Sequence, residues 1–377
     1  MTVQLPVTAA PVVAPASRRH GTFHPLRVRT VERLTDDAVA ITFDVPDELR
    51  GDYAFSAGQH LTVRTDIDGV EVRRNYSICA PATTGTLRVA VKRLAGGVFS
   101  GFATGTLRAG DTVDVMTPTG RFVPRLDPGN AKHYCAVAAG SGITPVLSIV
   151  ATVLDVEPDS RVTLLYGNRT SRSVMFLDEL ADLKDRHPTR LQLVHVLSRE
   201  AQDVELFHGR LDGPKLQRLL ATLVPPGTVD EWFLCGPFAM VEEVRATLLE
   251  VGVAPGVVHT ELFHVEGEPP RASATVPEGE RVEGSATVTI TLDGRTSSFD
   301  VPRGDGTRIL DAALTVRTDA PYACKGGVCG TCRARLVSGE VAMDRNYALE
   351  PDEIEAGFVL ACQSAPLSDT VALDFDA

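Results

Sequence analysis

The segment Cys324-Lys-Gly-Gly-Val-Cys329-Gly-Thr-Cys332 is the stretch around which the rest of the chain can be interpreted. Its cysteines have the spacing C-x4-C-x2-C, and a fourth cysteine, Cys362, lies well downstream. This arrangement is typical of the four thiolate ligands of a plant-type [2Fe-2S] cluster. Because three thiolates must converge from one short loop, the loop has to turn tightly, and glycines permit this. They also let backbone N–H groups approach the sulfurs; these glycines are Gly326, Gly327 and Gly330.

Two other uses of these cysteines compete with a cluster. A structural zinc site also takes four thiolates, but it usually contains two C-x2-C pairs, and only Cys329 and Cys332 form such a pair here. A disulfide framework does not suit a chain of 377 residues with seven cysteines. We therefore predict that the cluster ligands are Cys324, Cys329, Cys332 and Cys362, with a zinc site as the alternative.

The overall composition limits the partners and the compartment. The net charge of −12 argues against nucleic acid or an anionic membrane as the main partner. No apolar run approaches the ~20 residues that span a bilayer. Residues 1–20 are rich in Ala, Pro and Val, with basic residues only at the far end, which predicts a disordered tail and not a secretory signal. Cysteines without an export signal fit a reducing compartment, so we expect a cytoplasmic protein.

Residues 21–128 have the pattern of an antiparallel β-barrel. Short runs with alternating apolar and polar residues occur at 38–45, 60–64 and 87–93. Turn sequences separate such runs, as at Asp68-Gly69 and Gly110-Asp111. Many short strands joined by turns predict a barrel or a sandwich.

Residues 129–264 have a different pattern. The run Tyr134–Ala139 is almost continuously apolar, as expected of a parallel strand buried on both faces. Further strand candidates at 162–166, 191–197 and 231–235 alternate with helical segments such as 145–154. This alternation predicts an α/β domain with a parallel sheet.

The remaining residues form a predicted linker and a small third domain. Residues 265–285 are rich in Glu, Pro, Gly, Ala and Ser without periodicity, which is typical of a linker. Within 286–377 we expect a hairpin around Asp293-Gly294 and a helix over 308–314. The chain is thus predicted to be multidomain.

Two further segments fit the binding of a dinucleotide. The turn Gly140-Ser-Gly142-Ile-Thr144-Pro145 lies between a buried strand and a helix, where a pyrophosphate can bind. After the next strand, the segment 166–172 contains Arg169 and Arg172 but no acidic residue. Arginine there favours a 2′-phosphate, so we expect NADPH in preference to NADH. Solvated loop arginines would give the same sequence.

Three more segments are candidates for the reacting site. Arg74-Asn-Tyr76-Ser77 ends a barrel strand and offers a phosphate-binding cation, a ring that can stack, and a hydroxyl. Lys92 and the glycine-rich segment 96–100 could bind a second phosphate. Cys235-Gly-Pro-Phe-Ala-Met240 ends the last parallel strand, where ligands bind in such sheets. The thiol there is either a contact to a reacting ring or a buried structural cysteine.

Together these motifs resemble the ferredoxin–NADP reductase superfamily fused to a C-terminal plant-type ferredoxin. Arg74-x-Tyr76-Ser77 is similar to the flavin motif of the superfamily, and the segment 97–100 is similar to its flavin pyrophosphate loop. The segments 140–145 and 235–240 are similar to its pyridine-nucleotide motifs. The resemblance implies a β-barrel that binds FAD, an α/β nucleotide-binding domain, and an α+β ferredoxin domain of the β-grasp type.

The C-terminal part and two other segments resemble a more specific family within this superfamily. Residues 343–364, with 321–329 and 166–171, resemble the reductase subunits of bacterial ring-1,2-phenylacetyl-CoA epoxidases. That family implies electron transfer from NADPH through FAD and a [2Fe-2S] cluster to a di-iron oxygenase that epoxidises phenylacetyl-CoA. A reductase for a steroid or aromatic-ring hydroxylase is one alternative. A zinc-bearing interaction module on a degenerate reductase scaffold is an alternative of another class.

The resemblance also assigns roles to residues. Around the flavin N5 and the nicotinamide it places Ser77, Cys235 and Glu261. The implied FAD contacts are Arg74, Tyr76, Ser77, Lys92, Gly97, Val98, Ser100 and Phe263. The implied contacts of the pyridine nucleotide are Gly140, Gly142, Thr144, Pro145, Arg169, Arg172, Gly236, Pro237 and Met240.

Overall fold

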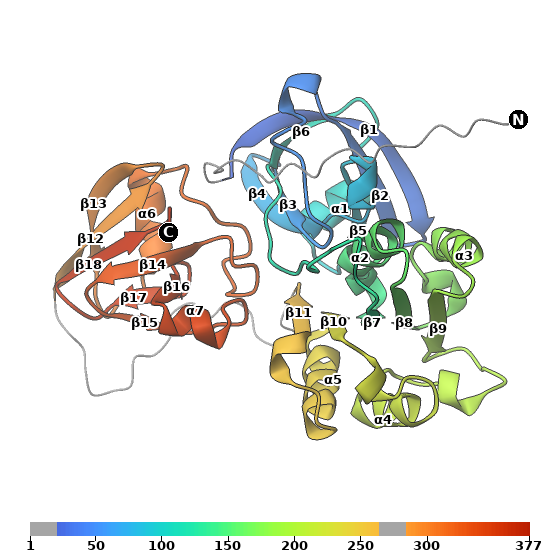
Figure 1. The fold of residues 1–377 in the computed structure, drawn as a ribbon. Coiled ribbons are helices and arrows are strands. Elements are labelled where there is room, and N and C mark those ends of the chain that lie inside the picture. Colours follow the sequence, from blue (N-terminus) through green and yellow to red (C-terminus); the bar gives the residue numbers. More distant parts are fainter. Residues whose placement is uncertain (1–20, 264–283) are drawn as a thin grey trace, which may run out of the picture.

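The computed structural model describes residues 21–263 and 284–377, which form three units (Figure 1). The predicted tail and nearly all of the predicted linker lie outside these described residues. Each unit has its own main sheet and an apolar core of its own, and a further core contains residues of both the barrel and the α/β domain. No helix in the described parts of the chain is long and apolar enough to cross a membrane.

The first unit is the predicted antiparallel barrel. Its elements are β1 (Phe23–Thr35), β2 (Ala38–Asp44), β3 (His60–Ile67), β4 (Val70–Ser77), β5 (Arg88–Lys92), α1 (Val98–Gly105) and β6 (Thr112–Met116). The strand order is β4-β3-β6-β1-β2-β5, and a bridge between Ile78 and Val89 joins the two edges. The sheet therefore closes on itself around its apolar side chains.

The second unit is the predicted α/β domain. Its strands are β7 (His133–Ala139), β8 (Arg161–Asn168), β9 (Leu191–Leu197), β10 (Glu231–Gly236) and β11 (Val258–Leu262). Its helices are α2 (Ile143–Val156), α3 (Leu177–Arg186), α4 (Gly213–Thr222) and α5 (Phe238–Glu250). The strands are parallel in the order β11-β10-β7-β8-β9.

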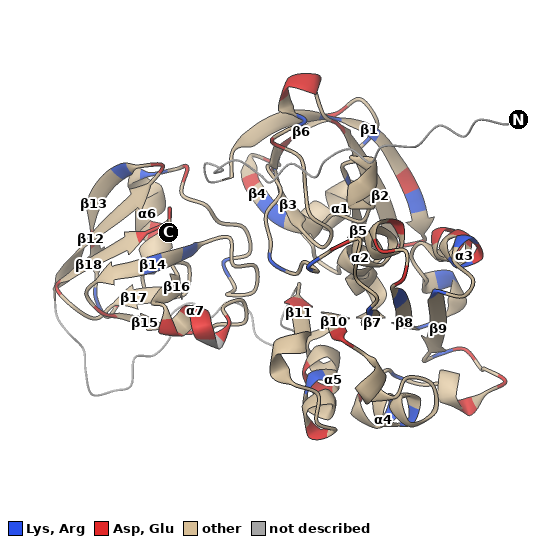
Figure 2. Ribbon diagram, in the orientation of Figure 1, with Lys and Arg blue, Asp and Glu red and all other residues tan. Residues whose placement is uncertain are grey.

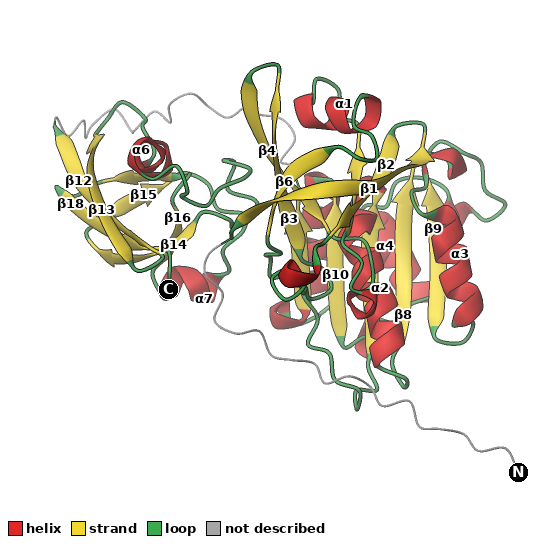
Figure 3. Ribbon diagram, turned by 90° about the horizontal axis from the view of Figure 1, so that it is seen from above, coloured by secondary structure: helices red, strands yellow, loops and turns green. Residues whose placement is uncertain are grey.

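The surroundings of β7 explain why its residues 134–139 are almost continuously apolar. Tyr134 and Ala136 belong to the core that includes side chains of α2 and α3. Cys135 and Val137 belong to the core that includes side chains of α4 and α5. Since successive side chains of a strand point to opposite faces, helices on both sides of the sheet require apolar residues at every position (Figure 3).

The third unit is a small α+β domain, as predicted. It contains β12 (Ser285–Leu292), β13 (Arg295–Pro302), α6 (Ile309–Val316), β14 (Arg333–Ser338), β15 (Val341–Met343), α7 (Pro351–Glu355), β16 (Phe358–Leu360), β17 (Ser364–Pro366) and β18 (Thr370–Asp374). The main sheet has the order β13-β12-β18-β14-β16. Asp293 and Gly294 have φ values of 53° and 68°, so the predicted hairpin turn is confirmed.

Candidate functional site

The strand β4 carries the predicted flavin motif. In the register with β3, Tyr76 lies opposite Leu61 and Arg74 lies opposite Val63, so these four side chains share one face. The ring of Tyr76 packs against Phe99 of α1, with 5.3 Å between ring centroids. The Arg74 side chain is exposed at this wall. An exposed guanidinium beside a supported aromatic ring fits a flavin and its phosphate.

The first turn of α1 forms the predicted phosphate loop. Gly96 has a φ of 72°, and Gly97 caps the helix, which packs against β4 and β5. Ser100 is buried, and its hydroxyl accepts a hydrogen bond from Leu94 N and donates one to Gly97 O. Helix N-termini favour negative charge, so this turn fits a pyrophosphate. Of the other predicted contacts, Val98 is exposed, and the Lys92 ammonium is 3.6 Å from Asp37.

The predicted catalytic side chains meet where the barrel contacts the α/β domain. The Ser77 hydroxyl donates a hydrogen bond to Glu261 Oε2 over 3.1 Å. Cys235 lies directly beside Glu261 in the pairing of β10 with β11. Burial, and then the charge of Glu261, raise the pKa of the Cys235 thiol well above its usual value. The thiol is therefore neutral and buried, and Phe263 is exposed just after β11.

A histidine that the sequence reasoning missed joins this group. His60 is 6% exposed and lies opposite Ser77 in the β3–β4 pairing. The Asn75 amide nitrogen, 3.1 Å from His60 Nε2, can only donate, so Nε2 is the acceptor. A neutral His60 thus carries its proton on Nδ1, which is 3.8 Å from Glu261 Oε1. His60, Glu261 and Ser77 can together hold or move a proton.

The two predicted nucleotide motifs pack against each other at the carboxyl ends of β7 and β10. A Cβ on Gly142 would lie 2.1 Å from Cys235 O, so the backbones approach too closely for any other residue. A Cβ on Gly236 would lie 2.8 Å from the Met240 methyl. Gly140 has a φ of 54°, which favours glycine. The glycines therefore bring both strand ends to one place, where nucleotides bind in such sheets.

The remaining predicted contacts in these motifs differ in exposure. Thr144 and Pro145 are buried in the first turn of α2, and the Thr144 hydroxyl donates a hydrogen bond to Ser141 O over 3.0 Å. Pro237 is exposed and precedes α5. Pro237 is thus more accessible to a ligand than Thr144 or Pro145.

The loop after β8 carries the two predicted arginines and lies beside a carboxylate. Arg169 and Arg172 are both exposed there, as expected for ligand-binding arginines. The segment 166–172 itself contains no acidic residue, but a carboxylate from another part of the chain lies beside it. Glu200, which follows β9, accepts hydrogen bonds from the Ser171 N–H at 2.7 Å and from the Ser171 hydroxyl at 2.9 Å. Parallel neighbouring strands bring Glu200 here, and its distance along the chain concealed it.

The four predicted cluster ligands meet as two pairs. The Cys329 thiol donates to Cys324, and the Gly326 N–H donates to the same sulfur at 3.3 Å, which lowers the pKa of the Cys324 thiol. The Cys332 thiol likewise donates to Cys362 and lowers the pKa of that thiol. The pKa values of the two donor thiols, Cys329 and Cys332, are raised by the same pairing, so in each pair the accepting sulfur is the one that is ready to bind metal as a thiolate.

This pairing fits a two-iron cluster, in which four cysteines supply two thiolates to each iron. In the described part of the chain, no three His, Cys, Asp or Glu side chains form a group that could hold one metal ion.

Comparisons with known families agree with these three sites. An oxidoreductase FAD-binding domain matches residues 25–123, and an oxidoreductase NAD-binding domain matches residues 136–246. A 2Fe-2S iron-sulfur cluster binding domain matches residues 290–367. The three cofactor domains thus follow one another in the predicted order.

One relative covers almost the whole chain. It is a subunit of the 1,2-phenylacetyl-CoA epoxidase of Escherichia coli, and it is 48% identical over 94% of this chain and 98% of its own length. The chain belongs to the family of reductase subunits that includes this epoxidase subunit. A second relative is the ferredoxin reductase component of 3-ketosteroid-9-alpha-monooxygenase from Rhodococcus rhodochrous, which is 35% identical over 93% of this chain and 96% of its own.

Solved structures place this reductase among modular electron-transfer proteins. Phthalate dioxygenase reductase superposes with a TM-score of 0.56 and 26% identity, covering 94% of this chain and 98% of its own. A type IV self-sufficient cytochrome P450 monooxygenase superposes with a TM-score of 0.67 and 25% identity. That superposition covers 93% of this reductase but only 41% of the monooxygenase. The barrel, the α/β domain and the cluster domain are thus a known architecture.

In this reductase the cluster domain contacts both other domains. The ring of Tyr347 packs edge-on against Phe238 at the start of α5, with 5.5 Å between centroids. Val328, within the cluster loop, packs on the apolar core of the α/β domain. Figure 2 shows that α7 is rich in acidic residues. One of them, Glu353, pairs with Arg121 of the segment that leaves the barrel. The cysteine loop is thus directed towards the flavin and nucleotide motifs (Figure 1).

Proposed function

We propose that this reductase passes electrons from NADPH through FAD and its [2Fe-2S] cluster to the di-iron oxygenase of a phenylacetyl-CoA epoxidase. The observation that carries the proposal is the near full-length identity of 48% to a subunit of the Escherichia coli enzyme. The convergence of the flavin, nucleotide and cysteine motifs on one region supports the same order of electron transfer. A cytoplasmic location fits this proposal, because a reducing compartment keeps cysteine thiols available to bind iron.

Each group of side chains described above would have a separate role in such a reductase. When bound, FAD accepts a hydride and releases electrons singly, which links a nicotinamide to a one-electron cluster. Arg74 and the first turn of α1 would hold the flavin phosphates. Ser77 and Glu261, with His60 behind them, would exchange the proton that accompanies flavin reduction. Gly142 and Gly236 would let the backbone approach the nucleotide.

The preference for NADPH rests on the arginines after β8. The guanidinium of Arg169 would pair with the 2′-phosphate, which NADH lacks. The Glu200 carboxylate accepts two hydrogen bonds from Ser171, and these reduce the repulsion that it would exert on a phosphate. We therefore expect Arg169→Ala to raise the KM for NADPH by about tenfold or more, because a hydrogen-bonded charge pair is lost.

The measurement is steady-state ferricyanide reduction with each nucleotide. We expect the KM for NADH to stay within about twofold, since no phosphate contact is removed. Arg186→Ala, which alters an exposed arginine of α3 in the same domain, serves as the control. Equal effects of Arg169→Ala on NADPH and NADH would refute the 2′-phosphate role.

The partner is tested by turnover, because artificial acceptors take electrons from any such reductase. The purified reductase is combined with the oxygenase subunits of a phenylacetyl-CoA epoxidase, NADPH and phenylacetyl-CoA, and epoxide formation is measured. The oxygenase of a 3-ketosteroid-9-alpha-monooxygenase forms the second arm, because its reductase component is the 35% identical relative. We expect turnover in the first arm only. Turnover in the steroid arm alone would overturn the assignment of the partner.

A further inference from the structure

The two faces of β4 have different neighbours. Arg74 and Tyr76 lie on the face predicted to contact the flavin. Arg73 and Asn75 alternate with them and lie on the opposite face, opposite Arg64 and Thr62 of β3. Both Arg73 and Asn75 contact the cluster domain. The strand thus presents Arg74 and Tyr76 on one face, and on the other face Ser77 together with the two residues that contact the cluster domain.

Asn75 is held firmly from the barrel side. Its amide oxygen accepts a hydrogen bond from the Thr62 hydroxyl at 2.7 Å. Its amide nitrogen donates to His60 Nε2 at 3.1 Å and to the Thr331 hydroxyl of the cluster loop at 3.2 Å. The amide has two N–H groups, so both donors are used, one within the barrel and one across the domain boundary.

Thr331 brings this contact into the cluster loop. It lies between two predicted ligands in the sequence, since Cys332 follows it directly and Cys329 is two residues before it. The hydrogen bond from Asn75 therefore reaches the cluster loop at a residue flanked by two predicted cluster ligands. We propose that Asn75 is a positioning residue for electron transfer: through Thr331 it holds the cluster loop against the strand that carries the flavin motif.

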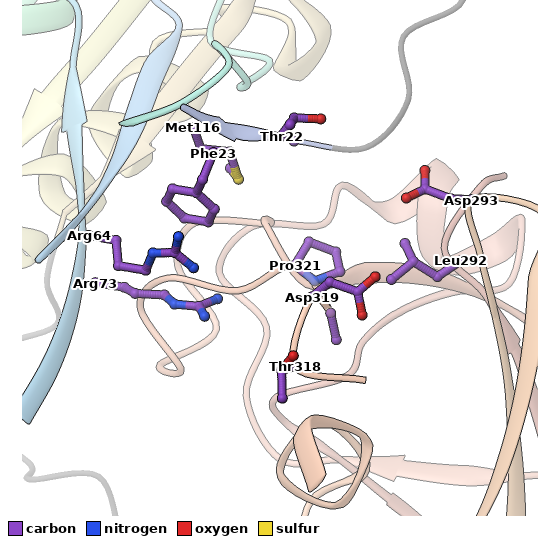
Figure 4. A pocket seen from close by; sticks show the side chains of 12 residues that line it. Thr22, Phe23, Arg64, Arg73, Met116, Leu292, Asp293, Thr318, Asp319 and Pro321 are labelled. Carbon is purple, nitrogen blue, oxygen red and sulfur yellow. The ribbon is translucent and has the colours of Figure 1, made fainter. Parts of the chain in front are cut away.

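A second residue on this face of β4 also contacts the cluster domain. The Arg73 guanidinium stacks on Tyr322, 4.3 Å from the ring centroid. Beyond it lies a cavity of about 290 Å³ between the barrel and the cluster domain. Figure 4 shows Arg64 and Arg73 on the barrel side of this cavity and Asp319 on the other side. Of these two contacts, the Asn75–Thr331 hydrogen bond is the one made with the cluster loop itself, residues 324–332.

This inference rests on the proposed electron path and adds a residue to it. Each NADPH delivers two electrons and one proton as a hydride, and the two electrons leave the flavin one at a time, each reducing the cluster once. Electron transfer slows steeply as the gap between donor and acceptor widens. A small displacement of the loop that carries Cys329 and Cys332 would therefore slow the second step without changing hydride transfer.

The test uses the full-length holoprotein and four variants. Thr331→Val removes the hydroxyl and keeps the shape, whereas Thr331→Ser keeps the hydroxyl and serves as the matched control. Asn75→Leu removes the donor from the other side of the boundary. The double variant Asn75→Leu with Thr331→Val closes a double-mutant cycle. Anaerobic stopped-flow mixing with NADPH follows flavin reduction and cluster reduction separately, and redox titration gives the midpoint potential of the cluster.

We expect Thr331→Val and Asn75→Leu each to slow cluster reduction about tenfold, because a small displacement of reacting groups from their aligned position slows a reaction markedly. The double variant should be no slower than either, because each single variant already lacks the Asn75–Thr331 contact across the domain boundary. Flavin reduction should be unchanged in Thr331→Val, and Thr331→Ser should behave as the unmodified protein. Hydrogen exchange of backbone amides in the cluster loop should be faster in the slowed variants, which reports docking independently of activity.

Two results would overturn the positioning role. One is cluster reduction at the unmodified rate in Asn75→Leu with unchanged exchange in the loop. The other is slowing in Thr331→Val alone, matched by a shift of the cluster potential, because Thr331 would then act only on Cys329. If the unmodified protein reduces its flavin but never its cluster, the proposed electron path itself fails, and the exchange measurement still decides whether Asn75 docks the loop.

Discussion

Replacing Cys329 by serine is expected to remove the iron–sulfur cluster and to stop electron delivery to the oxygenase. Serine offers a hard oxygen in place of a thiolate, and its pairing with Cys324 is lost. We expect oxygenase-coupled turnover to fall by at least about a hundredfold, because loss of a ligand exceeds the effect of losing an outer contact. NADPH-dependent ferricyanide reduction should persist, since the flavin and nucleotide sites lie in other domains.

Iron content, visible absorption and both activities are measured on the same preparation. Cys79→Ser is the matched control, because the Cys79 thiol is buried in the barrel and donates to Arg88 O, a bond that a hydroxyl can also make. The control should retain its cluster and both activities. Loss of flavin reduction in Cys329→Ser would show that the flavin and cluster sites do not function independently.

Replacing Gly142 by alanine is expected to disrupt the nucleotide site and to destabilise its domain. The added Cβ would lie 2.1 Å from Cys235 O and 2.7 Å from Gly236 N, both backbone atoms that no side-chain rotation can move. Forcing atoms into such a packed region costs about 3 kcal/mol of unfolding free energy or more. The shift would also displace the turn that is predicted to hold the pyrophosphate, so we expect a higher KM for NADPH.

Denaturant unfolding and steady-state kinetics provide the measurements. Gly227→Ala is the control, because the same added carbon would meet no atom within 4 Å in the same domain. The control should change neither the unfolding midpoint nor the KM. A Gly142→Ala protein with the stability and KM of the unmodified chain would contradict the close approach of the turn after β7 to the end of β10.

The sequence predicted the fold well where local patterns have one physical cause. The apolar run of β7 predicted a strand covered on both faces, and Tyr134 and Cys135 indeed belong to different cores. The turn sequence Asp293-Gly294 predicted a hairpin, and both residues have positive φ values. The cysteine spacing predicted a converging ligand set, and the four thiols meet as two pairs.

What the sequence could not provide are contacts made by distant elements. His60 begins a strand and belongs to no motif, and only the β3–β4 register brings it beside Ser77. Glu200 reaches Ser171 because two parallel strands end together. Thr331 reaches Asn75 because the third domain docks on the first. Strand alternation could have shown that Asn75 faces away from Tyr76, but not what it contacts.

The order of electron transfer is tested most directly by anaerobic titration of the purified holoprotein with NADPH, followed by visible absorption. We expect the flavin and cluster absorption to bleach together after about 1.5 equivalents of NADPH, since the flavin takes two electrons and the cluster one. A cluster that stays oxidised beside a fully reduced flavin would contradict the path. So would a protein with flavin absorption but zinc, and no iron, bound to its cysteines.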